Sequence, residues 1–417
     1  MRDRSAGLPP GSVPPRTPRP QPAPVCASAR IARLRRELED DPHAVQRLWD
    51  EAEAAGTPLL EPAGSPDECV ATFLWRGEAG RVLLLANKLT DRSHLERSLM
   101  ERVPGTDVWH LSYRLPTRWR GSYVFAPGPA GDTAALRELA SRAGLPDPYN
   151  CRILLQPPGV GARSVAELPQ APAQAYLRAR PGVPRGEVVE HDVQGAELGS
   201  RRVWAYTPAA PAGSALPLLV LLDGEMWLHR LSIVPTLDNL IADGAVPPLV
   251  AVMPEAGTRE ARFRDLSCSD SFTRFLATEL APWASASLGA TEDPARTVVA
   301  GQSLGGLAAA YAALEHPDRL GAVLAQSGSW WWPSANPDGV PPEALTRRVR
   351  ERASVPVRFY LENGTDEWVS LEPARRLRDA LRGRGYTVDY REFCGGHDQA
   401  CWRGGIADGL TALLRGA

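Results

Sequence analysis

The chain has 417 residues, of which 43% are hydrophobic and 23% are charged, a composition typical of a soluble globular protein with room for two domains. The formal net charge of −2 does not favour a nucleic-acid-binding protein, and we expect no nucleic-acid partner. Lys88 is the only lysine, so any anion site in this chain must be built from arginine guanidinium groups.

The N-terminal stretch is rich in proline and arginine and contains no apolar run long enough for export or for spanning a membrane. We therefore predict a disordered leader over residues 1–28 and no membrane association. The six cysteines show no CxxC spacing, and without an export signal we expect reduced thiols and a cytoplasmic protein.

Residues 29–159 are predicted to form a small antiparallel β-sandwich domain that begins with a helical segment over residues 29–55. Short apolar runs separated by glycine and proline turns predict four strands, at residues 70–75, 82–85, 109–113 and 123–125. Residues 160–184 are rich in proline, alanine and glycine, so we interpret them as a linker.

Residues 185–417 alternate predicted strands with predicted helices, which indicates an α/β domain with a mostly parallel sheet covered on both faces. Eight strands are expected, at residues 188–193, 203–206, 218–222, 249–253, 297–300, 322–326, 357–361 and 388–393. Helices are expected at residues 271–288 and 372–384, among others.

Residues 301–305 read G-Q-S-L-G, which matches the G-x-S-x-G pattern of a nucleophile elbow. An apolar run at 297–300 precedes the pattern and a helix-like run at 307–314 follows it, as such an elbow requires. The glycines permit a sharp turn that would expose the Ser303 hydroxyl between strand and helix, so Ser303 is the predicted nucleophile.

A serine hydrolase of this fold needs a histidine that follows the acid in the chain. Only His316 and His397 come after Ser303. His316 ends the helix that the elbow opens and is too near in sequence to reach back to the serine. His397 lies in a glycine-rich loop after the last predicted strand, and we predict that it is the catalytic base.

The acid is expected after the strand at 357–361, where Glu362, Asp366 and Glu367 crowd one turn. Glu362 stands at the very end of the predicted strand and is too early for the acid. Glu367 stands three residues past Gly364, the position that hydrolases with this turn use, and Asp366 remains the alternative.

The oxyanion hole requires two backbone N–H donors. We predict one at Leu304, directly after the nucleophile, and the other in the turn after the strand at 218–222, around Gly224 and Glu225. No metal ion or other cofactor is expected for this chemistry.

Several motifs resemble those of the enterochelin esterases, which open siderophore trilactones. They are AGQSLGGL at 300–307, QSGSWWWP at 326–333, GGHDQACWRGGI at 395–406, LLDGEMW at 221–227, and PGTDVWHLSYRLPTRWRGSYVF at 104–125 followed by DPYN at 147–150. The resemblance covers about residues 30–415 and both predicted domains. It implies a triad of serine, glutamate and histidine, which favours Glu367.

The resemblance also implies a small-molecule substrate, a ferric catecholate siderophore of the enterochelin type, whose esters are hydrolysed in the cytoplasm to release iron. Such a complex is strongly negative, and Arg262 and Arg264 are candidates to bind it by forked hydrogen bonds and stacking. Trp227 and Trp330 are candidate aromatic contacts for the substrate.

Two other hypotheses about the function remain open at this point. One is a generic carboxylesterase or acyltransferase of the same fold, and the other is a siderophore-binding protein without catalysis. The oligomeric state does not follow from the sequence.

Overall fold

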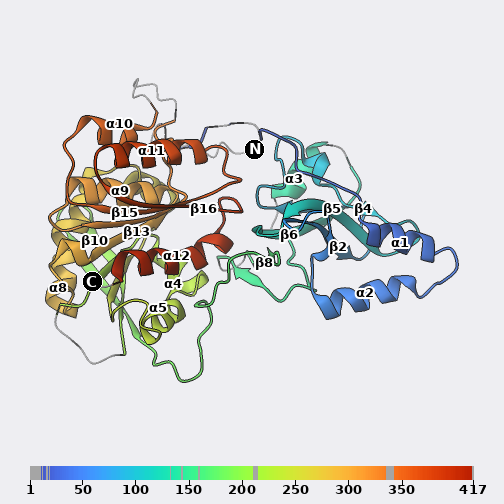
Figure 1. The fold of residues 1–417 in the computed structure, drawn as a ribbon, viewed down its shortest axis with the longest axis horizontal. Coiled ribbons are helices and arrows are strands. Elements are labelled where there is room, and N and C mark those ends of the chain that lie inside the picture. Colours follow the sequence, from blue (N-terminus) through green and yellow to red (C-terminus); the bar gives the residue numbers. More distant parts are fainter. Residues whose placement is uncertain are drawn as a thin grey trace. The chain divides into compact units, whose positions relative to one another are not determined.

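The computed structural model describes residues 11–415 except 12, 16, 18, 132, 142–143, 158–159, 210–214 and 335–341. The chain divides into two compact units, both drawn in Figure 1. The hydrolase unit consists of Met1–Thr17, Gln174–Phe393 and Trp402–Ala417, and the sandwich unit of Pro18–Ala173 and Cys394–Cys401.

The sandwich unit contains two four-stranded antiparallel sheets, with strand orders β1-β2-β5-β4 and β3-β6-β8-β7. Its strands are β1 (Leu59–Pro62), β2 (Glu68–Arg76), β3 (Arg81–Ala86), β4 (Glu101–Arg102), β5 (Val108–Pro116), β6 (Arg120–Gly128), β7 (Ile153–Leu155) and β8 (Ala162–Glu167). Residues from both sheets, including Phe73, Leu84 and Tyr123, share one buried core. The predicted antiparallel sandwich is thus confirmed, together with its four predicted strands.

Among its described residues, the sandwich unit has three helices, α1 (Ala29–Glu37), α2 (Ala44–Ala55) and α3 (Thr133–Ser141), with a 3₁₀ turn at Leu95–Ser98. The Ser28 side chain accepts a hydrogen bond from the Ile31 amide and so caps the start of α1. One face of α1 and α2 buries Ile31, Leu34 and Leu48 in a separate small core. The helical segment expected over residues 29–55 is therefore two packed helices.

The structure differs from the sequence-based prediction at both ends of the sandwich. Within the expected linker, β8 pairs with β6 and β7, so the second sheet extends to Glu167. Within the expected disordered leader, Val25 forms an antiparallel bridge with Tyr113, and the Arg114 amide donates to the Pro24 carbonyl at 2.9 Å. Residues 1–10, 12, 16 and 18 of that leader lie outside the described residues.

The hydrolase unit is built on one eight-stranded sheet with the order β16-β15-β14-β13-β11-β12-β10-β9. Its strands are β9 (Glu187–Gly195), β10 (Gly199–Thr207), β11 (Leu218–Leu221), β12 (Val250–Pro254), β13 (Thr297–Gln302), β14 (Ala322–Gln326), β15 (Arg358–Gly364) and β16 (Thr387–Phe393). All eight predicted strands are present. Strands β11 to β16 pair in parallel, and β9 and β10 form an antiparallel edge.

The helices of this unit are α4 (Gly224–Arg230), α5 (Ile233–Ala242), α6 (Arg259–Leu266), α7 (Asp270–Arg274), α8 (Ala281–Leu288), α9 (Leu304–Glu315), α10 (Ala344–Glu351), α11 (Leu371–Gly383) and α12 (Gln399–Leu414). A π-helical turn at Phe275–Leu280 joins α7 to α8, so the single helix expected at 271–288 is continuous but not uniformly α-helical. A 3₁₀ turn at Pro294–Arg296 precedes β13.

Helices cover both faces of the parallel sheet, with α9, α10 and α11 on one side and α4, α5 and α12 on the other (Figure 1). Val299, Val323 and Phe359 pack beneath the first group. On the opposite face Gly409 of α12 lies so close that an added Cβ would be 2.6 Å from Leu324 Cδ1. Coverage on both faces explains why these strands read as continuous apolar runs in the sequence.

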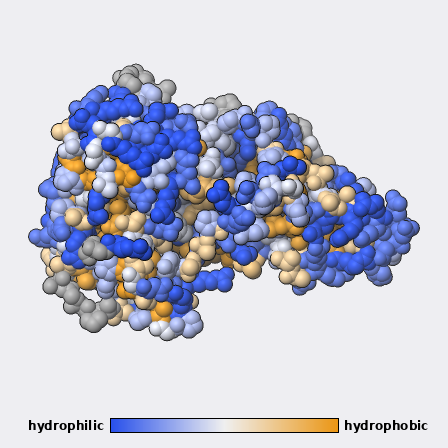
Figure 2. Space-filling model, viewed as in Figure 1, coloured by the Kyte–Doolittle hydropathy of each residue, from blue (hydrophilic) through white to orange (hydrophobic). Residues whose placement is uncertain are grey.

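The surface is hydrophilic over α11 and α1 in the view of Figure 2. Among the described residues, none of the helices combines the length and the apolar character needed to cross a membrane. All six cysteines are free thiols.

Candidate active site

The G-x-S-x-G segment forms the strand–turn–helix element predicted for it. Ser303 stands between the end of β13 and the start of α9, with φ 58° and ψ −123°. A non-glycine residue with positive φ is strained, and such strain is concentrated at functional sites. Packing requires a glycine at position 301, because a Cβ there would lie 2.4 Å from the backbone carbon of Gly305.

Backbone hydrogen bonds hold the elbow on the neighbouring strand β14. The Ser303 amide donates to the Gln326 carbonyl at 3.0 Å, and the Ser303 carbonyl accepts from the Ser329 amide at 2.9 Å. Leu304 is the first residue of α9, where backbone N–H groups have no carbonyl acceptor within the helix. The Leu304 N–H thus lies at the positive end of a helix and directly after Ser303, which makes it a candidate oxyanion donor.

The second candidate donor lies in the turn between β11 and α4. Strand β11 is the parallel neighbour of β13, so this turn and the elbow leave the same edge of the sheet. Asp223 has a left-handed backbone with φ 60°, and a Cβ on Gly224 would lie 2.5 Å from the Met253 carbonyl oxygen. Because the Met226 amide donates to the Asp223 carbonyl at 3.0 Å, Gly224 and Glu225 are the better candidates in the predicted region.

A polar network joins this turn to the elbow. Gln302, inside the elbow motif, donates from Nε2 to Asp223 Oδ2 at 3.0 Å and accepts from the Trp227 indole N–H at 2.9 Å. Asp223 is 5% exposed, and the Arg262 guanidinium binds it in a bidentate pair at 2.5 and 2.7 Å. The network fixes the relative position of the two backbone segments that carry the candidate oxyanion donors.

The two candidate acids differ sharply in their surroundings. Glu367 is 2% exposed, and its Oε1 accepts from the Ser327 hydroxyl at 2.5 Å and from the Gly364 amide at 2.8 Å, while Oε2 accepts from the Ser370 hydroxyl at 3.2 Å. Asp366 is half-buried in the same turn. A carboxylate fixed by three donors is suited to orient an imidazole, so the geometry favours Glu367.

Ser327, which the sequence analysis overlooked, supports this carboxylate. It follows β14, is fully buried and has φ 49°. Its hydroxyl donates to Glu367 and accepts from the Trp402 indole N–H at 2.8 Å. The available signal was its place in QSGS directly after a predicted strand, at the edge where catalytic groups gather.

Glu362 is a second buried carboxyl group near the site, and the described contacts give it no part in the triad. Its Oε1 accepts from the Gln326 Nε2 at 2.7 Å and its Oε2 from the Tyr360 hydroxyl at 3.4 Å. Burial is the largest cause that raises the pKa of Glu362 to about 7, against 4.5 for an ordinary glutamate. The carboxyl is therefore protonated over part of the neutral range.

This raised pKa predicts how Glu362→Gln changes stability with pH. Because the folded state holds the Glu362 proton more tightly than the unfolded chain, the wild type loses stability as pH rises from about 4.5 to about 7 and little more above that. Relative to wild type, Glu362→Gln should thus gain about 3 kcal/mol in free energy of unfolding across that window. Urea unfolding at pH 5 and pH 8 measures the gain, and parallel pH profiles would contradict it.

His397 follows β16, which pairs in parallel with β15 so that Phe393 lies opposite Gly364. The Thr365 amide donates to the Phe393 carbonyl at 2.9 Å, so the chain leaves β16 at the edge that carries Glu367. The segment Cys394–Cys401, with His397 in it, belongs to the sandwich unit. His397 is half-buried, and its carbonyl accepts from the Asn87 side-chain amide at 2.9 Å.

The predicted substrate contacts have varied surroundings. Arg262 is committed to Asp223, whereas Arg264 is 61% exposed and pairs with Asp265, which also binds Arg201 at 2.7 Å. Trp227 and Trp330 are 0% and 1% exposed. Their rings therefore pack in the interior instead of forming open aromatic walls.

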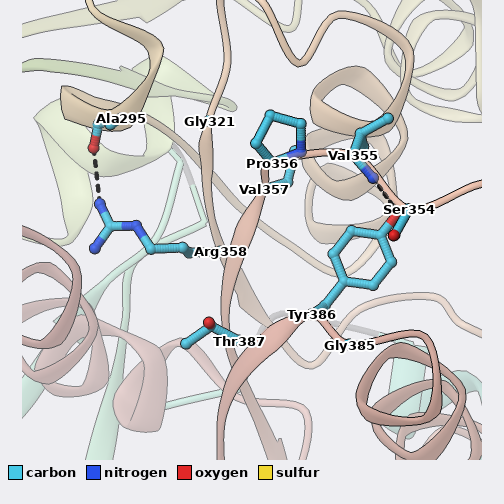
Figure 3. Close-up of a pocket in the computed structure, with 10 residues that line it drawn as sticks. All are labelled: Ala295, Gly321, Ser354, Val355, Pro356, Val357, Arg358, Gly385, Tyr386 and Thr387. Carbon is cyan, nitrogen blue, oxygen red and sulfur yellow. Dashed lines mark hydrogen bonds between the residues drawn. The ribbon is translucent and has the colours of Figure 1, made fainter.

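A pocket of about 330 Å³ lies at the opposite edge of the sheet, where β14, β15 and β16 begin (Figure 3). Gly321, Val357 and Tyr386 line it, together with Arg358, which donates to the Ala295 carbonyl at 2.7 Å. In parallel α/β sheets ligands bind at the carboxyl ends of strands, and Ser303 lies at that end. This pocket is accordingly remote from the candidate chemistry.

A serine on a strained elbow between a strand and a helix, at the carboxyl edge of a parallel sheet, defines an α/β-hydrolase of the esterase class. Two family models match, "Enterochelin esterase, N-terminal" over residues 70–177 and "Putative esterase" over residues 197–413. The chain belongs to the enterochelin esterase family.

Similar proteins match along almost the whole chain. The iron(III) enterobactin esterase of Dickeya dadantii (strain 3937) is 35% identical, with 88% of this chain and 92% of that protein aligned. The iron(III) salmochelin esterase of Escherichia coli O6:H1 is 33% identical over 93% and 98% of the two chains. The crystal structure of the enterobactin esterase of Shigella flexneri in the presence of enterobactin matches with a TM-score of 0.75 and 31% identity, over 89% and 98% of the chains.

Proposed function

We propose that this protein is a serine esterase that hydrolyses the ester bonds of ferric enterobactin-type catecholate siderophores in the cytoplasm, so that iron is released. The observation that carries the proposal is the strained Ser303 elbow, set in a chain that aligns over 88% of its length with an iron(III) enterobactin esterase. The alignment spans both units, so the likeness exceeds that of a generic hydrolase domain.

The proposed mechanism is acyl transfer through Ser303. His397 takes the proton from Ser303 Oγ as the oxygen attacks a seryl ester carbonyl, and Glu367 orients the imidazole and stabilises its charged form. The Leu304 N–H and an N–H of Gly224 or Glu225 stabilise the negative charge on the carbonyl oxygen. His397 then protonates the leaving alcohol, and water activated by the same imidazole hydrolyses the acyl-enzyme.

The negative charge of the proposed substrate requires cationic side chains near the site, which arginines can supply. A ferric tris-catecholate is strongly anionic, while the protein has a net charge of only −2, so attraction must come from local cations. Arg264 is the better placed of the two predicted arginines because its side chain is 61% exposed and only partly engaged by Asp265. We propose that Arg264 contacts the substrate and that Arg262 supports the oxyanion turn.

Covalent labelling tests the nucleophile directly. A fluorophosphonate should add to a single site in the wild type, mapped to Ser303 by peptide mass spectrometry, and Ser303→Ala should take up none. Nitrophenyl ester turnover should fall about 10⁴-fold or more in Ser303→Ala, since loss of the nucleophile removes most of a triad's contribution. Labelling at another serine with activity retained would refute the assignment.

Binding measurements separate the competing readings. Ser303→Ala should still bind the ferric siderophore, detected by quenching of tryptophan fluorescence, while it hydrolyses none of it. If the wild type binds the siderophore without turnover, the protein is a binding protein. If the wild type turns over nitrophenyl esters and neither binds nor cleaves the siderophore, it is a generic carboxylesterase.

A further inference from the structure

The segment that carries His397 belongs to the sandwich unit, whereas Ser303 belongs to the hydrolase unit. The chain runs through β16 to Phe393 in the hydrolase unit, and Cys394–Cys401 then packs as part of the sandwich unit. The chain rejoins the hydrolase unit at Trp402, within α12. Residues far away in sequence therefore determine the local structure around the predicted base.

Hydrogen bonds from β6 and from the loop after β3 hold this segment on the sandwich. The Asn87 side-chain amide donates to the His397 carbonyl at 2.9 Å. The Ser122 backbone amide of β6 donates to Asp398 Oδ2 at 2.6 Å. The Arg120 amide donates to the Cys394 carbonyl at 3.2 Å. The segment is thus held through the backbone carbonyl of His397 and through the side chain of the next residue, Asp398.

The segment is also fitted closely to the loop that follows β3. A Cβ on Gly396 would lie 2.1 Å from Lys88 Cγ and 2.6 Å from Asn87 Oδ1, so only glycine fits beside this loop. The Asn87 amide in turn donates to the Ser122 carbonyl at 2.9 Å, which ties the loop to β6. The contact is therefore close packing as well as hydrogen bonding.

The carboxylate of Asp398 completes the attachment. It is 3% exposed, and its second oxygen accepts from the Ala400 amide at 2.9 Å at the start of α12. The guanidinium of Arg163, on β8, donates to the Ser122 hydroxyl at 2.9 Å, and its pKa is lowered by burial and partly restored by the charge of Asp398. Sandwich residues Ser122 and Arg163 thus interact with the carboxylate that directly follows His397 in the chain.

We propose that the sandwich domain positions the catalytic base, and that Asn87 and Asp398 are positioning residues for His397. The inference rests on the proposed role of His397 as base. Acyl transfer needs the imidazole within hydrogen-bonding distance of the serine hydroxyl, and displacement of a catalytic group by about 1 Å can lower the rate about 100-fold. Fixing the His397 carbonyl restricts the backbone that bears the imidazole.

The test is a double-mutant cycle between Asn87 and His397, with ferric enterobactin as substrate. Asn87→Ala should lower kcat about 10- to 100-fold with KM little changed, because it misplaces the base and touches no substrate. In the His397→Ala background the same substitution should cause no further loss, since there is no base left to position. Asn87→Asp keeps the shape, loses the donor and should behave like Asn87→Ala.

Gln46→Ala on the exposed face of α2 is the matched sandwich control and should leave kcat unchanged. Thermal unfolding of each variant checks that the fold is kept. Unchanged kcat in both folded Asn87 variants, or an equal loss with and without His397, would overturn the positioning role and leave the esterase proposal standing. Full activity in His397→Ala would overturn the base assignment and this inference with it.

Discussion

Glu367→Gln is expected to lower kcat for ester hydrolysis by about four orders of magnitude, the loss that follows when a triad acid becomes an amide. Glu367 is 2% exposed and receives the Ser327 hydroxyl and the Gly364 amide on one oxygen. An amide can keep these two hydrogen bonds through its carbonyl oxygen, but it loses the charge that stabilises the imidazolium. Steady-state kinetics with a nitrophenyl ester measures the effect.

Asp366→Asn is the matched control, because it makes the same change one residue earlier in the same turn. We expect its kcat to stay within about two-fold of wild type, as for a substitution away from the reacting groups. If Asp366→Asn shows the large loss and Glu367→Gln does not, the acid is Asp366 and the geometric argument for Glu367 is wrong.

Arg262→Ala should lower the free energy of unfolding by about 3 kcal/mol, because it leaves the charge of Asp223 buried without its partner. Asp223 is 5% exposed and Arg262 25% exposed, so the expected loss lies at the low end of the range for buried pairs. We also expect a lower kcat, since Asp223 and Gln302 tie the oxyanion turn to the elbow. Urea unfolding and ester kinetics measure the two effects.

Arg264→Ala is the control for the loss of an arginine from the same helix. Its side chain is 61% exposed, and Asp265 keeps Arg201 as a partner, so we expect a change within about 0.5 kcal/mol. Adding Asp223→Asn to Arg262→Ala should recover part of the lost stability, because the unpaired charge is gone. Equal losses for Arg262→Ala and Arg264→Ala would contradict a buried-pair role.

The sheet and the elbow were predictable because their signals are local. Strands β11 to β14 are apolar runs bounded by turn residues. The elbow is a short pattern, and its first glycine, Gly301, is required by a contact within the motif. The turn that carries the candidate acids Asp366 and Glu367 was expected after the strand at 357–361, and the observed strand ends three residues later than expected, at Gly364.

The features that the sequence did not predict depend on contacts between distant parts of the chain. Strand β8 has the mixed sequence ARSVAE, with only the SVA stretch buried, so its pairing with β6 gives little periodic signal. The Asn87 amide and the His397 carbonyl are 310 residues apart in sequence. Arg262 was predicted as a substrate contact because sequence does not show that Asp223, 39 residues earlier, occupies its guanidinium. Pairings of this kind become visible only once the fold brings the partners together.

Mass-resolved product analysis with ferric enterobactin tests the central claim most directly. After incubation with the wild type, linear trimer, dimer or monomer of dihydroxybenzoylserine should appear, and after incubation with Ser303→Ala the trilactone should remain intact. An intact trilactone with the wild type, alongside turnover of nitrophenyl esters, would contradict the substrate assignment while leaving a serine hydrolase.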